Sequence, residues 1–434
     1  MKAVILAGGK GTRLAKLTKN TPKPLIKVGG KPVIEHQILL LRDYGIKEIW
    51  ILLGYFGEKI REYFQDGKKW KVKIHYYQEE KPLGTAGALK VLENEIKEDF
   101  LVFSGDVMMD FDLKRFINYH RQKKGIASIV VHPNDHPFDS DLVEVDKEGQ
   151  IISLLKRPHS PELTFRNLSI ASAYIFSPKI FKYIPIKIKS DIEKDIFPLI
   201  LKSKAKIYAY NSPEYFKDIG TPERLFKVRK DYTLGKIKRL NLKQKRKAIF
   251  LDRDGVINEE VDQLCKVEDL KIYDSTAKAI KKINEIGDLA IIISNQPMIA
   301  KGFMTENDLN EIHKKLETEL GKKGAKIDAI YYCPHHPEKG FPGEIPKLKI
   351  KCNCRKPEIG LFLKAQKDFN IDLKNSYSIG DKTSDILAGR RAGCKTILVK
   401  TGYGGKDKLF NAKPDFVAKN LLEAVKIIIK YDRK

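Results

Sequence analysis

The segment 249–256 constrains this chain most, because an apolar run stops there abruptly at the sequence Asp-Arg-Asp-Gly. Apolar, β-prone residues followed by two carboxylates and a glycine are typical of a buried strand that delivers acids to its carboxyl end, where open α/β sheets place their active sites. The pattern favours a strand at the start of a domain. We therefore expect a second catalytic domain to begin near residue 247, with the 246 residues before it forming a first domain.

The length of 434 residues predicts two or three domains, each large enough to bury a full core. Hydrophobic residues make up 42% of the chain and charged residues 32%, as in soluble globular proteins. No window approaches the roughly 20 uninterrupted apolar residues that a membrane helix needs, so we expect no membrane partner. Residues 1–9 could pass for a signal peptide, but their apolar run stops after five residues at glycines, and we expect a strand there.

The net charge is +26, and the excess lysines are spread over the whole length. No basic helix is interleaved with stacking aromatic residues, so a lysine-rich proteome, such as that of a thermophile, explains the charge better than nucleic-acid binding. Residues 235–247 hold seven cations in thirteen positions without an acid, which is typical of a solvated linker. We place the linker at 234–246, and a nucleic-acid or membrane patch there is the alternative. The positive field would also attract phosphorylated substrates.

A glycine-rich turn follows the first predicted strand, at residues 8–14. Its glycines, Gly8, Gly9 and Gly11, let backbone N–H groups approach a phosphate chain, while a lysine and an arginine supply positive charge. One such turn is weakly specific by itself. A little further on, Lys23 stands between two prolines, a stiff arrangement that fixes one ammonium group.

The two motifs resemble the signature of the sugar-1-phosphate nucleotidyltransferases, and the likeness continues in order through residues 78–89, 104–106 and 218–223. Four matches at family spacing make chance a poor explanation. The resemblance implies nucleotide contacts from Gly8, Gly9, Gly11, Thr12, Gln78, Gly84 and Thr85.

In-line attack of a sugar phosphate on the α-phosphorus of a nucleoside triphosphate is the chemistry that this resemblance implies. Charge builds on the phosphoryl oxygens and the leaving pyrophosphate, so catalysis needs positioning and cations. Arg13 suits the pyrophosphate and Lys23 the α-phosphate. Asp106 and Asp218 would hold Mg²⁺, although an ordinary strand-end carboxylate is the alternative at each.

The sugar pocket departs from the family pattern. Arg157 stands where the family often carries the lysine of Glu-Lys-Pro, and it can replace that lysine as a phosphate contact. Ile170 and Ser172 stand where the family often carries the first and third residues of Asn-x-Gly-x-Tyr. The motifs therefore predict the class of reaction. The identity of the sugar is inferred only from the pairing of the two domains.

Three further segments give the Asp252/Asp254 pair its partners. They are residues 294–296 at the end of a second apolar strand, residues 355–357, and residues 380–385 after a later strand. Their polar ends would meet at one edge of a parallel sheet. In order, the four segments resemble the motifs of the haloacid dehalogenase superfamily of phosphohydrolases.

That resemblance implies that Asp252 attacks phosphorus to form an aspartyl phosphate, and that Asp254 serves as general acid and then general base. It implies Mg²⁺ held by Asp252, by the carbonyl of Asp254 and by Asp381. The residues implied to contact phosphate or substrate are Ser294, Asn295, Arg355 and Lys356.

A cluster of three cysteines and a histidine indicates a second metal. Cys333, His335, Cys352 and Cys354 have the residue types and spacing of a closed, structural zinc site in a reducing compartment. His336 is the alternative histidine, and the resemblance places the ligand at His335. Unliganded cysteines are the other alternative at this cluster. Cys265 and Cys394 are expected to be ordinary thiols, and the protein to be cytoplasmic.

The fold class that we expect is α/β, with two Rossmann-like three-layer domains: a GT-A-like nucleotidyltransferase at 1–233 and a haloacid dehalogenase-like domain at 247–434. The zinc loop and the Asp-Arg-Asp-Gly motif look most like those of heptose 1,7-bisphosphate phosphatases. The pairing implies a phosphatase that supplies heptose 1-phosphate to a nucleotidyltransferase, GTP being favoured. The expected partners are therefore small-molecule substrates, with no nucleic acid, and a homo-oligomer is left open.

Two alternatives remain at this point. One is a hexose-1-phosphate nucleotidyltransferase, such as a mannose-1-phosphate guanylyltransferase, fused to a histidinol-phosphate-type phosphatase. The other is a phosphatase half that acts as a non-catalytic regulatory module, against which the intact set of Asp252, Asp254, Lys356 and Asp381 argues. The sequence does not choose the nucleobase, because Gln78 could meet guanine or a pyrimidine.

Overall fold

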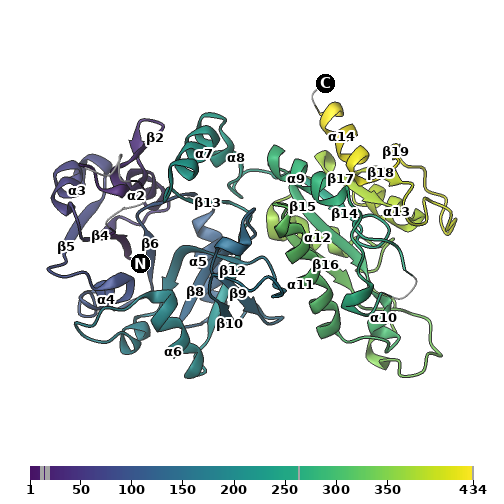
Figure 1. Cartoon of the computed structure of the whole chain (residues 1–434), viewed down its shortest axis with the longest axis horizontal. Helices are drawn as coiled ribbons and strands as arrows, with labels where there is room; N and C mark the ends of the chain where they lie inside the picture. Colours follow the sequence, from purple (N-terminus) through teal and green to yellow (C-terminus); the bar gives the residue numbers. More distant parts are fainter. Residues whose placement is uncertain (10–13, 15–19, 262–263, 433–434) are drawn as a thin grey trace. The chain divides into compact units, whose positions relative to one another are not determined.

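A computed structural model of the chain describes residues 1–9, 14, 20–261 and 264–432 (Figure 1). It divides into two compact units. Unit 1 comprises Met1–His132, Asp141–Leu155 and Leu168–Asn241, and unit 2 comprises Pro133–Ser140, Lys156–Asn167 and Leu242–Lys434. Each unit has its own sheet and its own hydrophobic core, as the predicted α/β fold class requires.

Unit 1 is built on a nine-stranded mixed sheet with β1 near its centre. Its strands are β1 (Ala3–Ala7), β4 (Glu48–Leu53), β5 (Lys73–Gln78), β6 (Phe100–Ser104), β8 (Ala127–His132), β9 (Leu142–Val145), β10 (Ile151–Leu155), β11 (Ser169–Phe176) and β12 (Ile207–Asn211). The order β10-β9-β11-β6-β1-β4-β5 continues from β11 through β8 to β12, and β1 runs parallel to both β4 and β6. Two small pairs stand apart, β13 (Tyr215–Asp218) with β7 (Val107–Asp110) and β2 (Lys27–Val28) with β3 (Lys31–Pro32).

Helices cover both faces of this sheet because its central strands are apolar on both sides. Ile5 in β1 packs toward α2, α3 and α5, whereas its neighbour Val4 packs toward α4 and α6. The helices of unit 1 are α2 (Val33–Asp43), α3 (Gly57–Phe64), α4 (Gly84–Lys90), α5 (Leu113–Lys123), α6 (Phe197–Lys202), α7 (Pro222–Thr233) and α8 (Lys236–Arg239).

Unit 2 contains a six-stranded, all-parallel sheet in the order β16-β15-β14-β17-β18-β19. Its strands are β14 (Ala248–Leu251), β15 (Leu289–Asn295), β16 (Ala329–Cys333), β17 (Tyr377–Gly380), β18 (Lys395–Val399) and β19 (Phe416–Ala418). The predicted strand before Asp252 is thus present as β14, and it lies between β15 and β17 (Figure 1).

Both faces of β14 are buried, which explains its continuous apolar run. Leu251 packs in the core formed with α9, α11 and α14, whereas Phe250 packs on the opposite face against α12. The helices of unit 2 are α9 (Thr276–Ile286), α10 (Pro297–Ala300), α11 (Glu306–Lys322), α12 (Gly360–Phe369), α13 (Thr383–Arg391) and α14 (Leu421–Tyr431).

Two short segments that interrupt the sequence of unit 1, residues 133–140 and 156–167, pack within unit 2 against α11. We call them the insert segments. Phe165 is fully buried beside Phe138, and its amide donates to the hydroxyl of Thr318 at 2.9 Å. Arg166 forms a two-pronged ion pair with Glu317. The sequence contains no local signal for this arrangement.

The division between the units falls between Asn241 and Leu242, inside the stretch predicted as a linker. This stretch differs from a fully solvated linker. Ile237 and Leu240 are buried in the core of unit 1 that includes α7, and Leu242 is buried in unit 2. Apolar residues spaced between the cations therefore anchor both ends of the basic run. Among the described residues, no helix is both long and apolar enough to cross a membrane.

Candidate active sites

The carboxyl end of β14 forms the centre of the site in unit 2. Asp252 follows the strand directly, is 8% exposed, and donates its amide N–H to the carbonyl of Ile379 on the neighbouring strand β17. Gly255 has a φ of +80°, and a Cβ there would lie 2.4 Å from a carboxylate oxygen of Asp381. Glycine is needed at 255 because a side chain would block the approach of Asp381 to this turn.

Lys356 joins two carboxylates at this strand end. Its Nζ lies 2.8 Å from Asp252 and 2.6 Å from Asp385, and it also donates to the carbonyl of Ile293. Burial raises the pKa of Asp252 to about 6, against the opposing effect of the lysine. Burial alone would lower the pKa of Lys356, but Asp252 and Asp385 outweigh it and raise that pKa. The site therefore holds a buried cation directly beside the predicted nucleophile.

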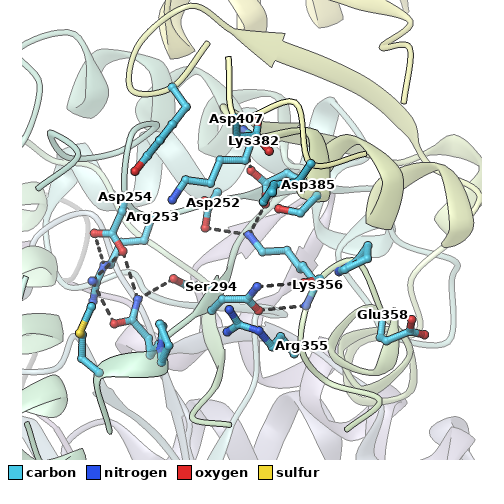
Figure 2. Close-up of a pocket in the computed structure, with 18 of the residues that line it drawn as sticks. Asp252, Arg253, Asp254, Ser294, Arg355, Lys356, Glu358, Lys382, Asp385 and Asp407 are labelled. Carbon is cyan, nitrogen blue, oxygen red and sulfur yellow. Dashed lines mark hydrogen bonds and ion pairs between the residues drawn. The ribbon is translucent and has the colours of Figure 1, made fainter. Parts of the chain in front are cut away.

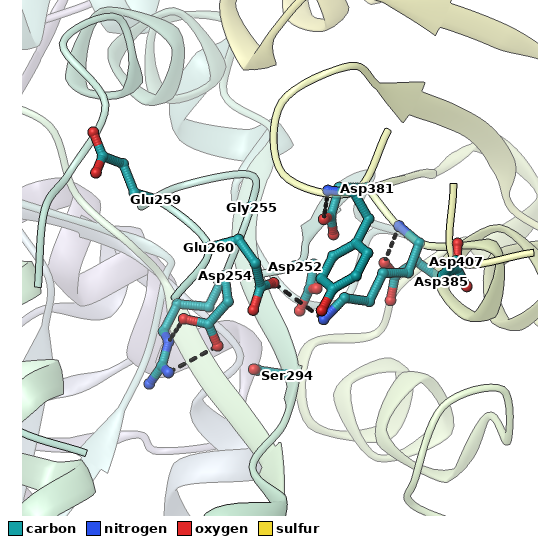
Figure 3. Close-up of polar contacts among 12 residues, drawn as sticks. Asp252, Asp254, Gly255, Glu259, Glu260, Ser294, Asp381, Asp385 and Asp407 are labelled. Atoms are coloured by element: carbon teal, nitrogen blue, oxygen red, sulfur yellow. Dashed lines mark hydrogen bonds and ion pairs between the residues drawn. The ribbon is translucent and has the colours of Figure 1, made fainter. Parts of the chain in front are cut away.

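Three carboxylates, Asp252, Asp381 and Asp385, gather from separate segments, with oxygens within 4.8 Å of one another (Figure 3). Burial, and then repulsion by the other two carboxylates, raises the pKa of Asp381 to about 8. Among the described residues, no hydrogen-bond partner reaches the buried Oδ1 of Asp381. Hard oxygen donors with an unsatisfied buried atom fit a divalent cation such as Mg²⁺.

Asp385 was not among the predicted ligands, although Asp381 and Asp252 were. It lies in the first turn of α13, which begins just after β17, so the sequence Asp-x-x-x-Asp at 381–385 was the available signal. The side chain of Asp254 is not part of this three-carboxylate group. Its oxygens instead accept hydrogen bonds from Arg253, Asn258 and Gln296.

Asp252, Asp254 and Asp385 line a cavity of about 910 Å³ in unit 2 (Figure 2). The predicted residues on its wall are Asp252, Asp254, Ser294, Asn295, Arg355 and Lys356. Residues on the wall that were not predicted include Glu260, Lys382, Tyr403 and Asp407. Asn295 holds the backbone of Lys356 in place, since its side chain accepts from the Lys356 amide at 2.9 Å and donates to the Lys356 carbonyl at 3.1 Å.

The predicted zinc ligands form one cluster beside this cavity. The ligand atoms of Cys333, His335, Cys352 and Cys354 lie within 4.8 Å of one another. The His335 Nδ1 lies 3.2 Å from the sulfur of Cys354, whereas His336 faces Glu338. Three thiolates and one imidazole at this spacing fit a tetrahedral Zn²⁺ site and favour His335 over His336.

The candidate site in unit 1 lies at the carboxyl end of β1, where a cavity of about 240 Å³ is lined by Gly8, Gly9, Lys23, Gly84, Thr85 and Asp106, all predicted. A Cβ at Gly54 would lie 2.5 Å from the carbonyl oxygen of Gly8, so the two backbones approach closely here. Gly84 has a φ of +74° and lies against the backbone of Ser190. Gly11, Thr12 and Arg13 lie outside the described residues.

Lys23, Asp106 and Asp218 come together in unit 1. The Lys23 ammonium pairs with the Asp106 carboxylate, whose other oxygen accepts from Ser104 at 2.7 Å. Asp218 ends β13, which pairs with β7 so that Asp218 lies opposite Val107, next to Asp106. Burial alone would raise the pKa of Asp218, but the Arg224 guanidinium at 2.7 Å outweighs it and lowers that pKa. This arrangement keeps a second carboxylate ionised beside the first.

Two of the predicted contacts, Gln78 and Arg157, are not among the residues that line this cavity. Gln78 is exposed, its amide donates to the carbonyl of Gly54, and its neighbour Glu79 lines the cavity instead. Arg157 belongs to an insert segment of unit 2, where it donates to the carbonyl of Asp139. Sequence reasoning also missed Lys189 and Asp191, which line the cavity from a segment without a recognisable motif.

Ser172, which stands where the family often carries glycine, has a φ of +51°. This left-handed conformation favours glycine, so serine adds backbone strain at this point of β11. The pairing of β11 with β8 is irregular between Ile170 and Tyr174. The backbone therefore keeps the left-handed conformation that glycine would adopt, although the residue is serine.

Comparison with known proteins places both units in families. The family described as Nucleotidyl transferase matches residues 2–234, and the family described as HAD-hydrolase-like matches residues 353–424. The chain belongs to the nucleotidyl transferases. Its second half belongs to the haloacid dehalogenase superfamily of phosphatases, and we refer below to the transferase unit and the phosphatase unit.

Individual relatives agree with this division. A D-glycero-α-D-manno-heptose-1,7-bisphosphate 7-phosphatase from Photorhabdus laumondii subsp. laumondii is 41% identical over 183 residues, which are 42% of this chain and 96% of that protein. A UTP–glucose-1-phosphate uridylyltransferase from Synechocystis sp. is 35% identical over 234 residues, 51% of this chain and 60% of that protein. The catalytic subunit beta of a mannose-1-phosphate guanylyltransferase from Drosophila pseudoobscura pseudoobscura is 32% identical over 261 residues, 59% of this chain and 67% of that protein.

Proposed function

We propose that the chain is a bifunctional enzyme of nucleotide-sugar synthesis. The phosphatase unit removes the 7-phosphate of D-glycero-D-manno-heptose 1,7-bisphosphate, and the transferase unit joins the resulting heptose 1-phosphate to GMP from GTP. The observation that carries this proposal is the set of Asp252, Lys356 and Asp381 at the carboxyl edge of one sheet, in a unit 41% identical to a heptose bisphosphate phosphatase over 96% of that relative.

In the phosphatase unit, Asp252 would attack phosphorus while the bond from phosphorus to the C7 oxygen breaks. Asp254 would give a proton to the leaving oxygen and then take one from the water that releases orthophosphate from Asp252. Lys356 would bind the phosphoryl oxygens and hold the nucleophile ionised. Mg²⁺ held by Asp252, Asp381 and the Asp254 carbonyl, with Asp385 beside them, would offset the repulsion between carboxylate and phosphate.

In the transferase unit, an oxygen of the sugar phosphate would attack the α-phosphorus of GTP, and pyrophosphate would leave. Lys23 would neutralise the α-phosphate, and the predicted role of Arg13 is to neutralise the leaving pyrophosphate. Asp106 and Asp218 would hold Mg²⁺, which supplies further positive charge to the phosphates. Gly8 and Gly9 give the backbone the close approach that a triphosphate needs.

Glu79 supports GTP as the nucleotide. Its Oε1 accepts from the Leu83 amide at 3.0 Å, while its Oε2 lies beside Gly8 in the cavity. A carboxylate is a hydrogen-bond acceptor only, and guanine presents two adjacent donors, N1–H and the N2 amino group, on one edge. Uracil presents only one donor, N3–H, between two acceptors. A half-buried carboxylate in the cavity therefore fits guanine better than uracil.

The same residues support a cytoplasmic setting as part of this proposal. Three thiolates in a metal cluster need a reducing compartment, and the substrates are small phosphorylated molecules. We therefore place the enzyme in the cytoplasm.

The test uses the full chain with heptose 1,7-bisphosphate, GTP and Mg²⁺. We expect orthophosphate, pyrophosphate and a GDP-heptose detected by mass spectrometry, and heptose 1-phosphate alone when GTP is omitted. Parallel reactions contain UTP, ATP, CTP or dTTP, and mannose 1-phosphate or glucose 1-phosphate as the acceptor. Formation of a nucleotide-hexose with the heptose substrates untouched would refute the proposal.

A further inference from the structure

Arg253 stands between the two aspartates of the phosphatase motif and is one of the largest fully buried side chains, at 1% exposure. Taking a guanidinium out of water destabilises the folded protein unless an opposite charge and hydrogen bonds compensate. An apolar residue would fill the same space without this cost. The charge of Arg253 therefore has to be explained by what it contacts.

Arg253 donates two parallel hydrogen bonds to the carboxylate of Asp254 (Figure 2). Its Nε lies 3.0 Å from Oδ1, and its Nη2 lies 2.8 Å from Oδ2. Two parallel bonds from a rigid guanidinium fix the plane of a carboxylate as well as its position. Asn258 adds a donor to Oδ1 at 2.9 Å, so this carboxylate is held from more than one side.

Gln296 completes the arrangement and connects it to the phosphate end of the site. Its Oε1 accepts from Arg253 at 3.2 Å, and its Nε2 donates to Asp254 at 3.1 Å. The same Nε2 lies 2.7 Å from the hydroxyl oxygen of Ser294, the predicted phosphoryl contact. Gln296 is 3% exposed, so these bonds are shielded from water. One amide thus relates the orientation of Asp254 to the position of Ser294.

We propose that Arg253 and Gln296 are positioning residues that hold the carboxyl group of Asp254 in line for its two proton transfers. This inference rests on the proposed phosphatase mechanism. In the first step, Asp252 bonds to phosphorus, the bond to the sugar oxygen breaks, and that oxygen receives a proton from Asp254. In the second step, water bonds to phosphorus, Asp254 receives the water proton, and the bond from Asp252 to phosphorus breaks.

Geometry explains why such positioning is needed. Asp254 lies three residues beyond Leu251, the last residue of β14, so the strand does not fix its side chain. A misplacement of about 1 Å can cost roughly a hundredfold in rate. Asp252, in contrast, adjoins the strand and is held by Lys356.

The test compares two substrates in Arg253→Met. An alkyl ester such as the heptose bisphosphate needs a proton on its leaving oxygen, whereas p-nitrophenyl phosphate does not. We expect kcat for the alkyl ester to fall about a hundredfold with little change in KM, while the p-nitrophenolate burst keeps its rate. Equal losses for the ester and the burst would mean general damage to the fold and would overturn the proposal.

A double-mutant cycle with Asp254→Asn provides the second readout. If Arg253 acts through Asp254, adding Arg253→Met to Asp254→Asn lowers the rate no further. Full additivity of the two losses would refute the proposal. If Arg253→Met does not fold, the same double-mutant cycle is measured with Arg253→Lys or with Gln296→Met in its place. Arg253→Lys keeps the charge but not the paired hydrogen bonds. Arg390→Met is the control, because that guanidinium bonds a backbone carbonyl at the surface.

The choice of substrates separates this inference from the proposed function. Fructose 1,6-bisphosphate is a second alkyl ester of the same class. If the parent enzyme ignores both esters yet shows a burst with p-nitrophenyl phosphate, the heptose assignment fails. The double-mutant cycle is then measured by the rate of orthophosphate release after the burst. This release step still needs Asp254 to activate water.

Discussion

The ammonium group of Lys356 lies 2.8 Å from the carboxylate of Asp252, and both side chains are almost fully buried. A second carboxylate, Asp385, approaches the same ammonium at 2.6 Å. Lys356 is therefore the cation that balances a buried group of acids, as well as a phosphate contact by position. Its removal affects both roles.

Lys356→Met should lower the phosphatase kcat by about 10² to 10³, the usual effect of removing one group that stabilises transition-state charge. Without the lysine, the buried Asp252 would also be protonated more readily and so be a poorer nucleophile. Orthophosphate release measures this effect, and pyrophosphate release by the transferase unit from added heptose 1-phosphate and GTP serves as the internal control. A phosphatase rate equal to that of the parent would contradict the role of Lys356.

Glu79→Gln should weaken the preference for GTP over UTP. An amide offers one acceptor and one donor group where the carboxylate offers acceptors, so guanine loses a bidentate partner. Such a pair contributes about 1–3 kcal/mol of discrimination, or roughly 5- to 150-fold in the ratio of kcat/KM values. Glu80→Gln is the matched control, because the adjacent glutamate is exposed and does not line the cavity. Equal changes in both variants would rule out a base-reading role.

His335→Gln should lose zinc, whereas His336→Gln should retain it. Only the first histidine approaches the sulfur cluster, at 3.2 Å from Cys354, and structural zinc contributes directly to folding free energy. Metal content by mass spectrometry and hydrogen exchange over residues 333–356 measure the effect. The phosphatase rate should fall with zinc loss, because Arg355 donates to the carbonyl of His335. Zinc retained in both variants would point to another ligand.

Arg166→Met should destabilise the phosphatase unit by about 3 kcal/mol, because it leaves Glu317 buried without its cation. Glu317 is 6% exposed, and Arg166 from the insert segments neutralises its charge. Urea unfolding followed by a probe in the phosphatase unit measures the change. Lys315→Met is the control on the same helix, since its partly exposed pair with Glu319 should contribute less than about 1 kcal/mol. Similar losses in both variants would mean that the buried pair has no special role.

His313 should make the phosphatase unit sensitive to acid. Burial, reinforced by Arg253 and Arg166, lowers the pKa of this histidine well below its ordinary value. The folded state then binds fewer protons than the unfolded state, so stability is complete above about pH 6.5 and falls as the pH decreases. At pH 5.5 the loss is on the order of 1 kcal/mol.

His313→Gln should remove this part of the pH dependence. The measurement is the difference in free energy of unfolding between pH 7.5 and pH 5.5, taken for each protein separately so that any offset from the substitution cancels. An unchanged difference would show that other groups cause the acid sensitivity.

The edge of the sheet that carries the candidate site of the phosphatase unit could be predicted from sequence because each of its parts is a local pattern. Apolar runs end in polar residues at Asp252, Ser294 and Asp381, and parallel strands bring such ends to one edge. Asp385 was missed because its position depends on the helix that begins after β17. The cluster of three cysteines and a histidine was predicted for a similar reason, since its residue types and spacing are specific.

The contacts of Gln78 and Glu79 could not be assigned in the same way. Successive side chains at the end of a strand point in opposite directions, so a shift of one residue decides which of them enters the cavity. Either residue satisfied the pattern of polar groups before Gly84. Only the packing of β5 against β4 fixed the choice, by turning Gln78 onto Gly54.

The sequence by itself determined the two α/β units, the order of their motifs and the polar residues at each strand end, because these depend on short-range patterns of apolar and polar residues. The tertiary structure decided how residues distant in sequence serve one another. Arg166 meets Glu317 across 151 positions, and Arg253 and Gln296 together orient Asp254. Such pairings depend on complementary shape and charge in three dimensions, which no local pattern encodes.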